Sequence, residues 1–254
     1  MNLSIFNPDT GTLIHQEFTL HKHLVVREMD GFRWFHLGGS SVQSLMDLHC
    51  TKKIVLPVYQ SMLLFLLWKG ENLQILNLGM GAGGFERALQ VSPHINVTSV
   101  EQDPQIAAMA RNYFFLPDTV QVYIQSAQQF IEQNHNQYDI VLCDIFIEHK
   151  HCQCINDLNF YQNLHKSMKQ SGVALINLFV ETELQLLDIL QGVHNVFSYS
   201  ALIEFTDYKN IVLIVSDLPI PAKEQLFVSN KNGNNSSGID FDNMINHLYH
   251  IKKS

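Results

Sequence analysis

Between residues 73 and 179, short apolar runs of strand length alternate with segments in which apolar residues recur at helical spacing. Strands separated by helices are typical of a parallel sheet with helices on both faces. The pattern therefore predicts an α/β fold with a doubly wound, mostly parallel, Rossmann-like sheet. A helix at 181–191 and apolar runs at 196–203 and 210–217 predict an antiparallel edge. The expected parallel strands are 73–79, 95–101, 120–125, 138–144 and 172–179, and the expected helices are 84–91, 104–114, 127–133 and 157–169.

The first 52 residues show a looser alternation of apolar and polar positions, interrupted by turn signals at Asn7-Pro8-Asp9 and Asp30-Gly31. Alternation with such turns predicts a small antiparallel β domain over 1–52. The segment 56–69 is apolar nearly all round, which predicts a buried helix. This helix begins the Rossmann-like domain, which we expect over 53–229.

The last segment, 230–254, combines a Gly/Asn/Ser-rich stretch with a second periodic pattern. The polar stretch has little to bury and predicts a linker. After it, apolar residues at helical spacing predict an amphipathic helix that docks on the chain's own body or on a second subunit. These residues are Phe241, Met244, Ile245, Leu248 and Tyr249.

Three alternate glycines follow the first expected strand of the sheet: Gly79, Gly81 and Gly83. Ligands of open parallel sheets bind at the carboxyl ends of the strands. Glycine lets a ligand approach the main chain, although such a turn also serves to pack a helix against a strand. Glu101 ends the second strand, at a place where an acidic residue accepts hydrogen bonds from ribose hydroxyls. A solvated carboxylate is the alternative, but the two features together predict a nucleoside-containing ligand.

A further carboxylate, Asp144, ends the fourth expected strand. A side chain at the carboxyl end of a central strand points into the crevice where ligands bind. Asp144 is therefore a candidate base, or a group that orients an amine. Helix capping or a hydrogen bond within the loop is the alternative interpretation.

With these residues in place, the chain resembles the spermidine synthase family of aminopropyltransferases, built on the class I S-adenosylmethionine-dependent methyltransferase fold. The resemblance runs from about residue 31 to residue 217, and the family also has a small N-terminal β domain. It implies S-adenosylmethionine or its decarboxylated form as donor substrate, no tightly bound cofactor, a small amine or other nucleophile as acceptor, and a homodimer. It is carried by LGGSSVQS with Gln43, VYQSML with Tyr59, LNLGMGAGG, VTSVEQDP with Glu101, YDIVLCD with Asp144 and NFYQNLHKSMKQSGVALIN.

The resemblance also assigns roles to single residues. Asp144 and Tyr59 are the expected catalytic residues: Asp144 positions or deprotonates the acceptor, and Tyr59 lines the acceptor pocket. Gln125 and Ser126 stand where the family has an acidic residue near the adenine. The residues expected to bind the donor are Gln43, Gly79, Gly81, Gly83, Glu101, Gln125, Ser126 and Asp144.

At two places the sequence departs from the family. Ala82 replaces an aspartate of the glycine loop, and Ile147 replaces the second acid of a D-x-x-D pattern that begins at Asp144. Buried ammonium groups need carboxylates in exchange for lost hydration. We therefore expect reduced or altered polyamine aminopropyltransferase activity, unless Glu148 substitutes. The alternatives are an S-adenosylmethionine-dependent methyltransferase, since Ala82 would not repel a donor carboxylate, and a non-catalytic nucleoside-binding homologue.

Composition narrows the class of protein further. With 46% hydrophobic residues, 16% charged residues and a net charge of -8, the chain shows no basic footprint for nucleic acid or an anionic membrane. No secretory signal pattern is present, and the longest apolar run, 62–68, is too short to cross a bilayer. Four cysteines are too few for a disulfide scaffold, which predicts a cytoplasmic protein.

One cluster has the residue types of a zinc site. The segment EHKHCQC holds His149, His151, Cys152 and Cys154. Their spacing is crowded and the sequence has no obvious matching cluster elsewhere, so we expect no metal site.

Overall fold

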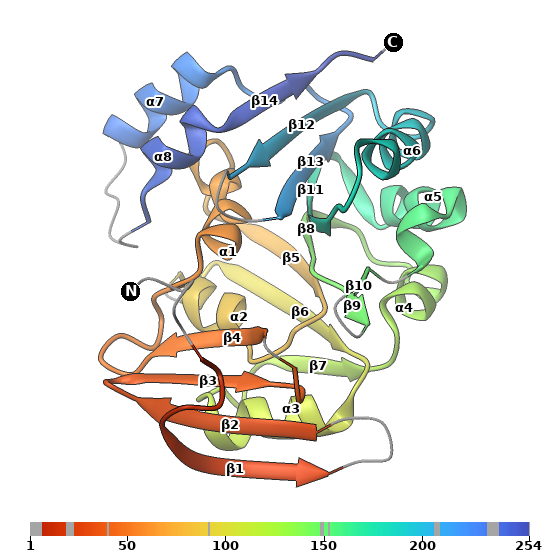
Figure 1. The fold of residues 1–254 in the computed structure, drawn as a ribbon. Coiled ribbons are helices and arrows are strands. Elements are labelled where there is room, and N and C mark those ends of the chain that lie inside the picture. The colour runs from red at the N-terminus through yellow and green to blue at the C-terminus, as the bar shows by residue number, and fades with distance from the viewer. Residues whose placement is uncertain are drawn as a thin grey trace.

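The computed structural model describes residues 7–18, 23–39, 41–90, 92–147, 150–151, 153–205, 209–232 and 239–253. One eight-stranded sheet forms the body of the molecule, and a four-stranded antiparallel sheet lies against one end of it (Figure 1). The strands of the large sheet, in spatial order, are β14 (Leu248–Ile251), β12 (Tyr199–Glu204), β13 (Asn210–Ser216), β11 (Met168–Phe179), β8 (Tyr138–Cys143), β5 (Leu73–Leu78), β6 (Ile95–Glu101) and β7 (Gln121–Ile124).

Five consecutive strands, β11, β8, β5, β6 and the edge strand β7, run parallel, and β13 pairs antiparallel with β11. This arrangement confirms the doubly wound, mostly parallel sheet with an antiparallel edge. The chain places β6 and β7 on one side of β5 and β8 and β11 on the other. The carboxyl end of β5 is therefore the point where the strand order reverses, which is where such sheets bind ligands.

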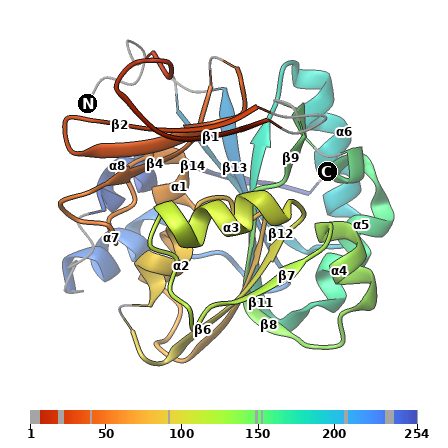
Figure 2. The same ribbon diagram turned by 90° about the horizontal axis from the view of Figure 1, so that it is seen from below.

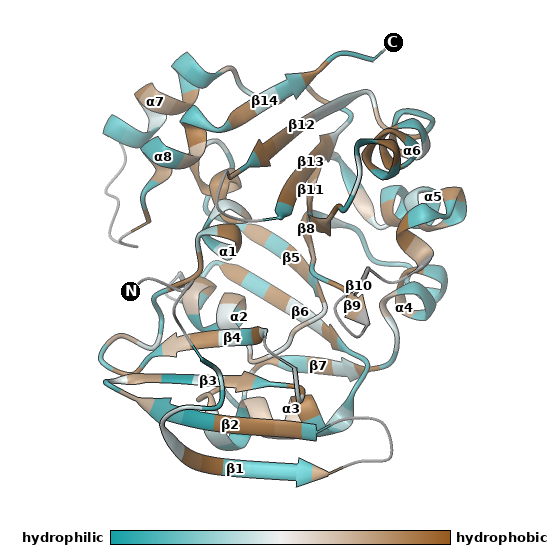
Figure 3. Cartoon of the chain, viewed as in Figure 1, coloured by the Kyte–Doolittle hydropathy of each residue, from teal (hydrophilic) through white to brown (hydrophobic). Residues whose placement is uncertain are grey.

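Helices cover both faces of the large sheet, so its strands are buried on both sides and form nearly continuous apolar runs. Accordingly, β8, β11 and β13 are mostly brown in Figure 3. One face carries α1 (Pro57–Ser61), the 3-10 helix η2 (Leu64–Leu67), α2 (Gly84–Leu89), α7 (Lys223–Asn232) and α8 (Phe241–Asn246), and the other carries α4 (Ala127–Gln133), α5 (Leu158–Lys166) and α6 (Glu183–His194).

The small sheet is a meander of β1 (Thr12–Phe18), β2 (His23–Met29), β3 (Phe32–His36) and β4 (Val42–Asp47), which confirms the predicted antiparallel β unit. Asp30 (φ 52°) and Gly31 (φ 79°) join β2 to β3 with the left-handed pair that a tight hairpin turn requires. The inner face of this sheet packs on α3 (Pro104–Tyr113) (Figure 2). Ala82 lies in the same buried cluster. The small sheet therefore covers the carboxyl end of β5.

The segment 56–69 is buried as predicted, but it does not form one continuous helix. Pro57 begins α1, and Leu63 leaves the α region (φ -95°, ψ 6°), after which the chain continues as η2. A segment that is apolar all round has no amphipathic stripe to hold one helix axis, so packing decides where the turns break. The predicted helix over 157–169 also ends early, at Lys166, because β11 begins at Met168.

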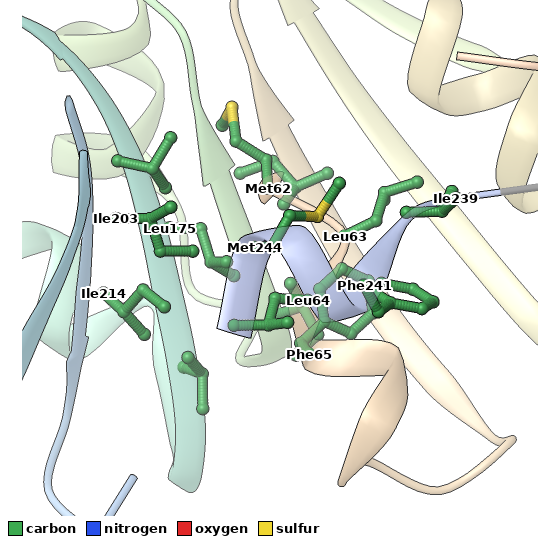
Figure 4. Packing of buried hydrophobic residues seen from close by; sticks show 14 of the residues in the cluster. Met62, Leu63, Leu64, Phe65, Leu175, Ile203, Ile214, Ile239, Phe241 and Met244 are labelled. Atoms are coloured by element: carbon green, nitrogen blue, oxygen red, sulfur yellow. The ribbon is translucent and has the colours of Figure 1, made fainter. Parts of the chain in front are cut away.

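Only the first part of the predicted C-terminal helix is helical. α8 ends at Asn246, while Leu248 and Tyr249 belong to β14, which pairs antiparallel with β12. Phe241 and Met244 of α8 lie in one buried cluster with Leu64 of η2 (Figure 4), so the segment docks on the chain's own body. α7 runs to Asn232, into the stretch predicted to be a linker, and the domain boundaries at 52 and 229 stay predictions.

The remaining short elements lie after β8: the two-stranded pair β9 (Phe146–Ile147) and β10 (Lys150–His151), and the 3-10 helix η3 (Gln153–Asn156). None of the described helices has both the length and the apolar character needed to cross a membrane.

Candidate functional site

A cavity of about 380 Å³ lies where the small sheet covers the carboxyl ends of β5, β6 and β8. Its size falls within the range of small-molecule sites. The two strands that flank β5 each supply a carboxylate to it, Glu101 at the end of β6 and Asp144 directly after β8. Seven of the predicted site residues line this one cavity: Gln43, Tyr59, Gly79, Gly81, Glu101, Ser126 and Asp144.

The glycine loop begins with two main-chain N–H groups, of Gly79 and Met80, that donate to the Val100 carbonyl at 3.0 and 3.1 Å. Gly79 has a φ of 88°, and a Cβ there would lie 2.1 Å from the Asp144 carbonyl oxygen. Gly81 has a φ of 56°, and no described heavy atom lies within 4 Å of a Cβ built on it. Gly79 thus lets two strand ends meet, while Gly81 leaves the main chain open toward the cavity.

Glu101 is held by main-chain donors at the cavity wall. Its Oε2 accepts from the Gly81 N–H at 3.0 Å, and its Oε1 accepts from the Asp103 N–H, also at 3.0 Å. Asp103 in turn caps α3 by accepting from the Gln105 N–H at 2.9 Å. Glu101 is buried, at 8% exposure, and its predicted contact with ribose stays a prediction.

Asp144 is held from the other side, by side chains. Its Oδ1 accepts from Asn177 Nδ2 at 2.7 Å, and the Tyr59 hydroxyl also hydrogen-bonds to it. Burial raises the pKa of the Asp144 carboxyl to about 6, and the hydrogen bonds from Asn177 and Tyr59 oppose part of that rise. Asp144 is therefore an acid–base group that ionises close to neutral pH.

Tyr59 is the second predicted catalytic residue, and its hydroxyl lies between two acceptors. It donates to the Gln43 carbonyl oxygen at 3.3 Å and contacts the Asp144 carboxyl. Its ring packs edge-on against Phe85, with centroids 5.7 Å apart. Burial, and then the charge of Asp144, raise the pKa of Tyr59 well above its usual range, so the hydroxyl remains a donor at neutral pH.

Beneath the glycine loop lies a buried acid that the sequence alone did not single out. Glu86 has no exposed surface, and its Oε1 accepts from Asn77 Nδ2 and from Ser99 Oγ, both at 2.6 Å. Burial raises the pKa of the Glu86 carboxyl, and these two hydrogen bonds oppose the rise. Its signal in the sequence is an acidic residue on the buried side of a short helix.

The neighbouring Arg87 braces the loop. Its guanidinium donates to three main-chain oxygens, those of Ala82 at 2.5 Å, Phe114 at 2.8 Å and Thr51 at 2.9 Å. Burial lowers the pKa of Arg87 to about 10, and the charge of Glu86 opposes that change. The loop is therefore fixed from below before any ligand enters.

Gly83 and Gln125 are not among the described residues that line the cavity. A Cβ at Gly83, whose φ is 72°, would lie 2.6 Å from Leu116 Cδ1, so this glycine serves helix packing. The Gln125 N–H donates to the Glu101 carbonyl at 3.1 Å. Ser126 lines the cavity and also caps α4, accepting from the Gln129 N–H at 3.2 Å. The binding roles of all three stay predictions.

The two departures from the spermidine synthase pattern lie near the cavity. Ala82 is buried and lines it, while Ile147 lies in β9, directly after the lining residue Phe146. Glu148 falls outside the described residues, so its predicted substitution for the missing acid stays a prediction.

The candidate zinc ligands His149 and Cys152 also fall outside the described residues. Within the part of the chain that the structure describes, no group of three or more His, Cys, Asp or Glu side chains is placed to hold a metal ion.

Known proteins share this architecture. Residues 76–176 match a family described as a methyltransferase domain. The polyamine aminopropyltransferase of Chromobacterium violaceum is 28% identical over 156 residues, which cover 60% of this chain and 60% of that relative. The match therefore spans less than two thirds of the relative's length.

Two solved structures extend the likeness to nearly the whole chain. A probable spermidine synthase from Corynebacterium glutamicum superposes with a TM-score of 0.74 and 18% identity, covering 95% of this chain and 90% of that one. A spermidine synthase in complex with the transition-state analogue AdoDATO gives a TM-score of 0.69 and 14% identity, covering 94% and 84%.

Proposed function

We propose, on the premise that the chain has a spermidine synthase-like class I methyltransferase fold, that it transfers a group from an S-adenosylmethionine-type donor to a small nucleophile. The observation that carries the proposal is the placement of Glu101 and Asp144 in one cavity, on strands at either side of β5. Glu101 can accept hydrogen bonds from ribose hydroxyls, and Asp144 can accept the proton of a nucleophile. The name of the Chromobacterium violaceum relative supports aminopropyl transfer as the reaction.

The donor end of the cavity fits a nucleoside. Glu101 is oriented by the Gly81 and Asp103 N–H groups, and the open side of Gly81 allows a ligand to reach the main chain. Ser126 and Gln128 line the same cavity from the start of α4, next to Glu101, on the side where the resemblance implies the adenine. These residues bind and orient the donor, and its sulfonium supplies an activated carbon.

At the acceptor end, Asp144 and Tyr59 act on the nucleophile. The amine lone pair forms the new bond to the carbon beside sulfur, the carbon–sulfur bond breaks, and its electrons remain on the neutral thioether that leaves. The proton released by the amine passes to the Asp144 carboxylate. Alignment of amine, carbon and sulfur supplies much of the acceleration in such a displacement.

The neutral side chain of Ala82 shapes the proposed specificity. The loss of one carboxylate contact to a buried ammonium costs on the order of 2–5 kcal/mol of binding free energy. We therefore propose reduced or altered activity toward diamines. Ala82 also favours a second candidate, methyl transfer from S-adenosylmethionine, because an aspartate in the loop would repel the carboxylate of that donor.

The test uses the purified chain. Calorimetry with S-adenosylmethionine, its decarboxylated form and methylthioadenosine shows which nucleoside binds. Decarboxylated donor is then supplied with putrescine while spermidine and methylthioadenosine are followed together, with Asp144→Asn as the inactive comparison. We expect nucleoside binding with slow aminopropyl transfer; failure to bind any of the three compounds would overturn the proposal.

The proposal includes a homodimer, as the resemblance implies, and a cytoplasmic location, as the cysteine content implies. Light scattering at micromolar concentration tests the assembly, and a monomer mass would contradict it.

A further inference from the structure

A chain of amide hydrogen bonds leads away from Asp144 across neighbouring strands of the sheet. Asn177 Nδ2 donates to Asp144 Oδ1 at 2.7 Å, and Asn210 Nδ2 donates to Asn177 Oδ1 at 3.0 Å. The strands involved, β8, β11 and β13, lie side by side in Figure 1. Neither asparagine is among the described residues that line the cavity.

Strand register explains why these three side chains meet. β11 and β13 are antiparallel with Asn177 opposite Val212, so Asn210, two residues along, is the diagonal neighbour on the same face. β8 and β11 are parallel with Cys143 level with Ile176, which brings Asp144 level with Asn177. The three side chains meet because Asp144 is level with Asn177 and Asn210 is the diagonal neighbour of Asn177.

Each amide of this chain has a defined orientation. Asn177 is 4% exposed within the buried, apolar second half of β11, where an unpaired amide would be costly. Its oxygen would repel the Asp144 carboxylate if the amide turned over, whereas its N–H group stabilises that charge. The Asn210 donor bonds to the Asn177 oxygen and thereby keeps the N–H side toward Asp144.

We propose, resting on the proposed function, that Asn177 and Asn210 are positioning residues that fix the Asp144 carboxyl for proton transfer from the acceptor. Asn177 occupies Oδ1, so the carboxyl cannot rotate without losing that bond. Asn210 acts one step further out, through the Asn177 amide. The titratable group that faces Asp144 from the helix side is Tyr59, and it remains protonated at neutral pH.

Two variants test the two links of the hydrogen-bond chain Asn210–Asn177–Asp144, which we call the relay. Asn177→Leu removes the donor to Asp144, and Asn210→Ser leaves that donor in place but frees its orientation. We expect kcat to fall about tenfold or more for the first and less for the second, the loss expected for one hydrogen bond to a charged group. The acid limb of the pH–rate profile should move to higher pH in the same order, because the ionised carboxyl has lost stabilisation. Donor affinity should stay within about twofold of wild type, since neither residue borders the cavity.

The matched control is Asn96→Ser, an exposed position near the start of β6, which should leave kcat, donor affinity and the pH profile unchanged. The Asp144 carboxyl is also titrated by carbon-13 NMR without any substrate. If the wild-type chain transfers no group, the proposed function fails. The midpoint of the Asp144 titration by NMR then decides alone whether Asn177 and Asn210 position the carboxyl.

A raised midpoint in both variants, larger in Asn177→Leu, supports the relay. Unchanged midpoints would overturn it, and so would a loss of donor binding as large as the loss of kcat. Circular dichroism checks folding, and if Asn177→Leu does not fold, the midpoint of Asn210→Ser alone decides between these outcomes.

Discussion

A Cβ atom at Gly79 would lie 2.1 Å from the main-chain oxygen of Asp144, so only glycine fits where the ends of β5 and β8 meet. Gly81, two residues later, also has a positive φ, but a Cβ there would point into open space. The Gly79 backbone thus has a structural role, whereas for Gly81 the predicted role is ligand access. Substitution separates these roles.

Gly79→Ala should destabilise the fold by about 2–5 kcal/mol, from backbone strain together with overpacking against Asp144. Gly81→Ala should cost only about 1–2 kcal/mol of strain but weaken nucleoside binding at least about tenfold, because its methyl group fills the approach to the main chain. Urea unfolding and calorimetry measure the two effects. Gly70→Ala, with an open environment and ordinary φ, is the control, and equal stability of the Gly70 and Gly79 variants would contradict this account.

Glu101→Gln should weaken nucleoside binding by about 1–3 kcal/mol, because a charge-assisted acceptor for ribose hydroxyls becomes a neutral one. Calorimetry gives the affinity directly. The control is Asp118→Asn, a fully exposed acid paired with Arg111 at 3.8 Å on the surface. If both variants bind as wild type does, Glu101 does not contact the ribose.

The rate of transfer should rise with pH through about 6, where Asp144 is half ionised, because Asp144 accepts a proton only when ionised and its pKa is about 6. The kcat/KM profile from pH 5 to 9 measures this limb. Asp144→Asn should be slow at every pH. An acid limb that persists in the variant would assign the titration to another group.

Glu86→Gln should gain stability relative to wild type as pH rises. The pKa of Glu86 in the folded chain lies above its ordinary value of 4.5, so the native state binds more protons than the unfolded state between the two values. The Glu86 carboxyl therefore makes its full contribution to the free energy of unfolding below about pH 4.5. This contribution is lost as the pH rises through the pKa of Glu86 in the folded chain. Urea unfolding of both proteins at pH 5 and pH 8 gives the difference, and a constant difference would show that Glu86 is ionised when buried.

The sequence predicts those parts of the site that depend on local pattern. Glycines at a strand end, Glu101 after the next strand and Asp144 after the fourth are all recognisable because the fold brings carboxyl ends together. Asn177 is visible only as a polar residue within a buried run. Its partner depends on how β11 aligns with β8 and β13, which no local pattern specifies.

The C-terminal segment shows the same limit. Leu248 and Tyr249 continue the helical spacing that begins at Phe241, yet they form β14, because the open edge of β12 offers hydrogen bonds to a strand. Over four residues, helical and strand spacing are too similar to separate. Tertiary context decides between them.

The cavity wall comes from two sheets that share no strand. Phe35 and Leu45 belong to the small sheet, while Glu101 ends β6 and Gly81 follows β5 in the large one. We expect a molecule bound there to contact both sheets and so to oppose their separation. If its amides exchange with solvent through such detachment, saturating ligand should slow their hydrogen exchange by a factor near 1 + [L]/Kd. Affinity could then be measured at amides of β2, a strand that contributes no described residue to the cavity wall.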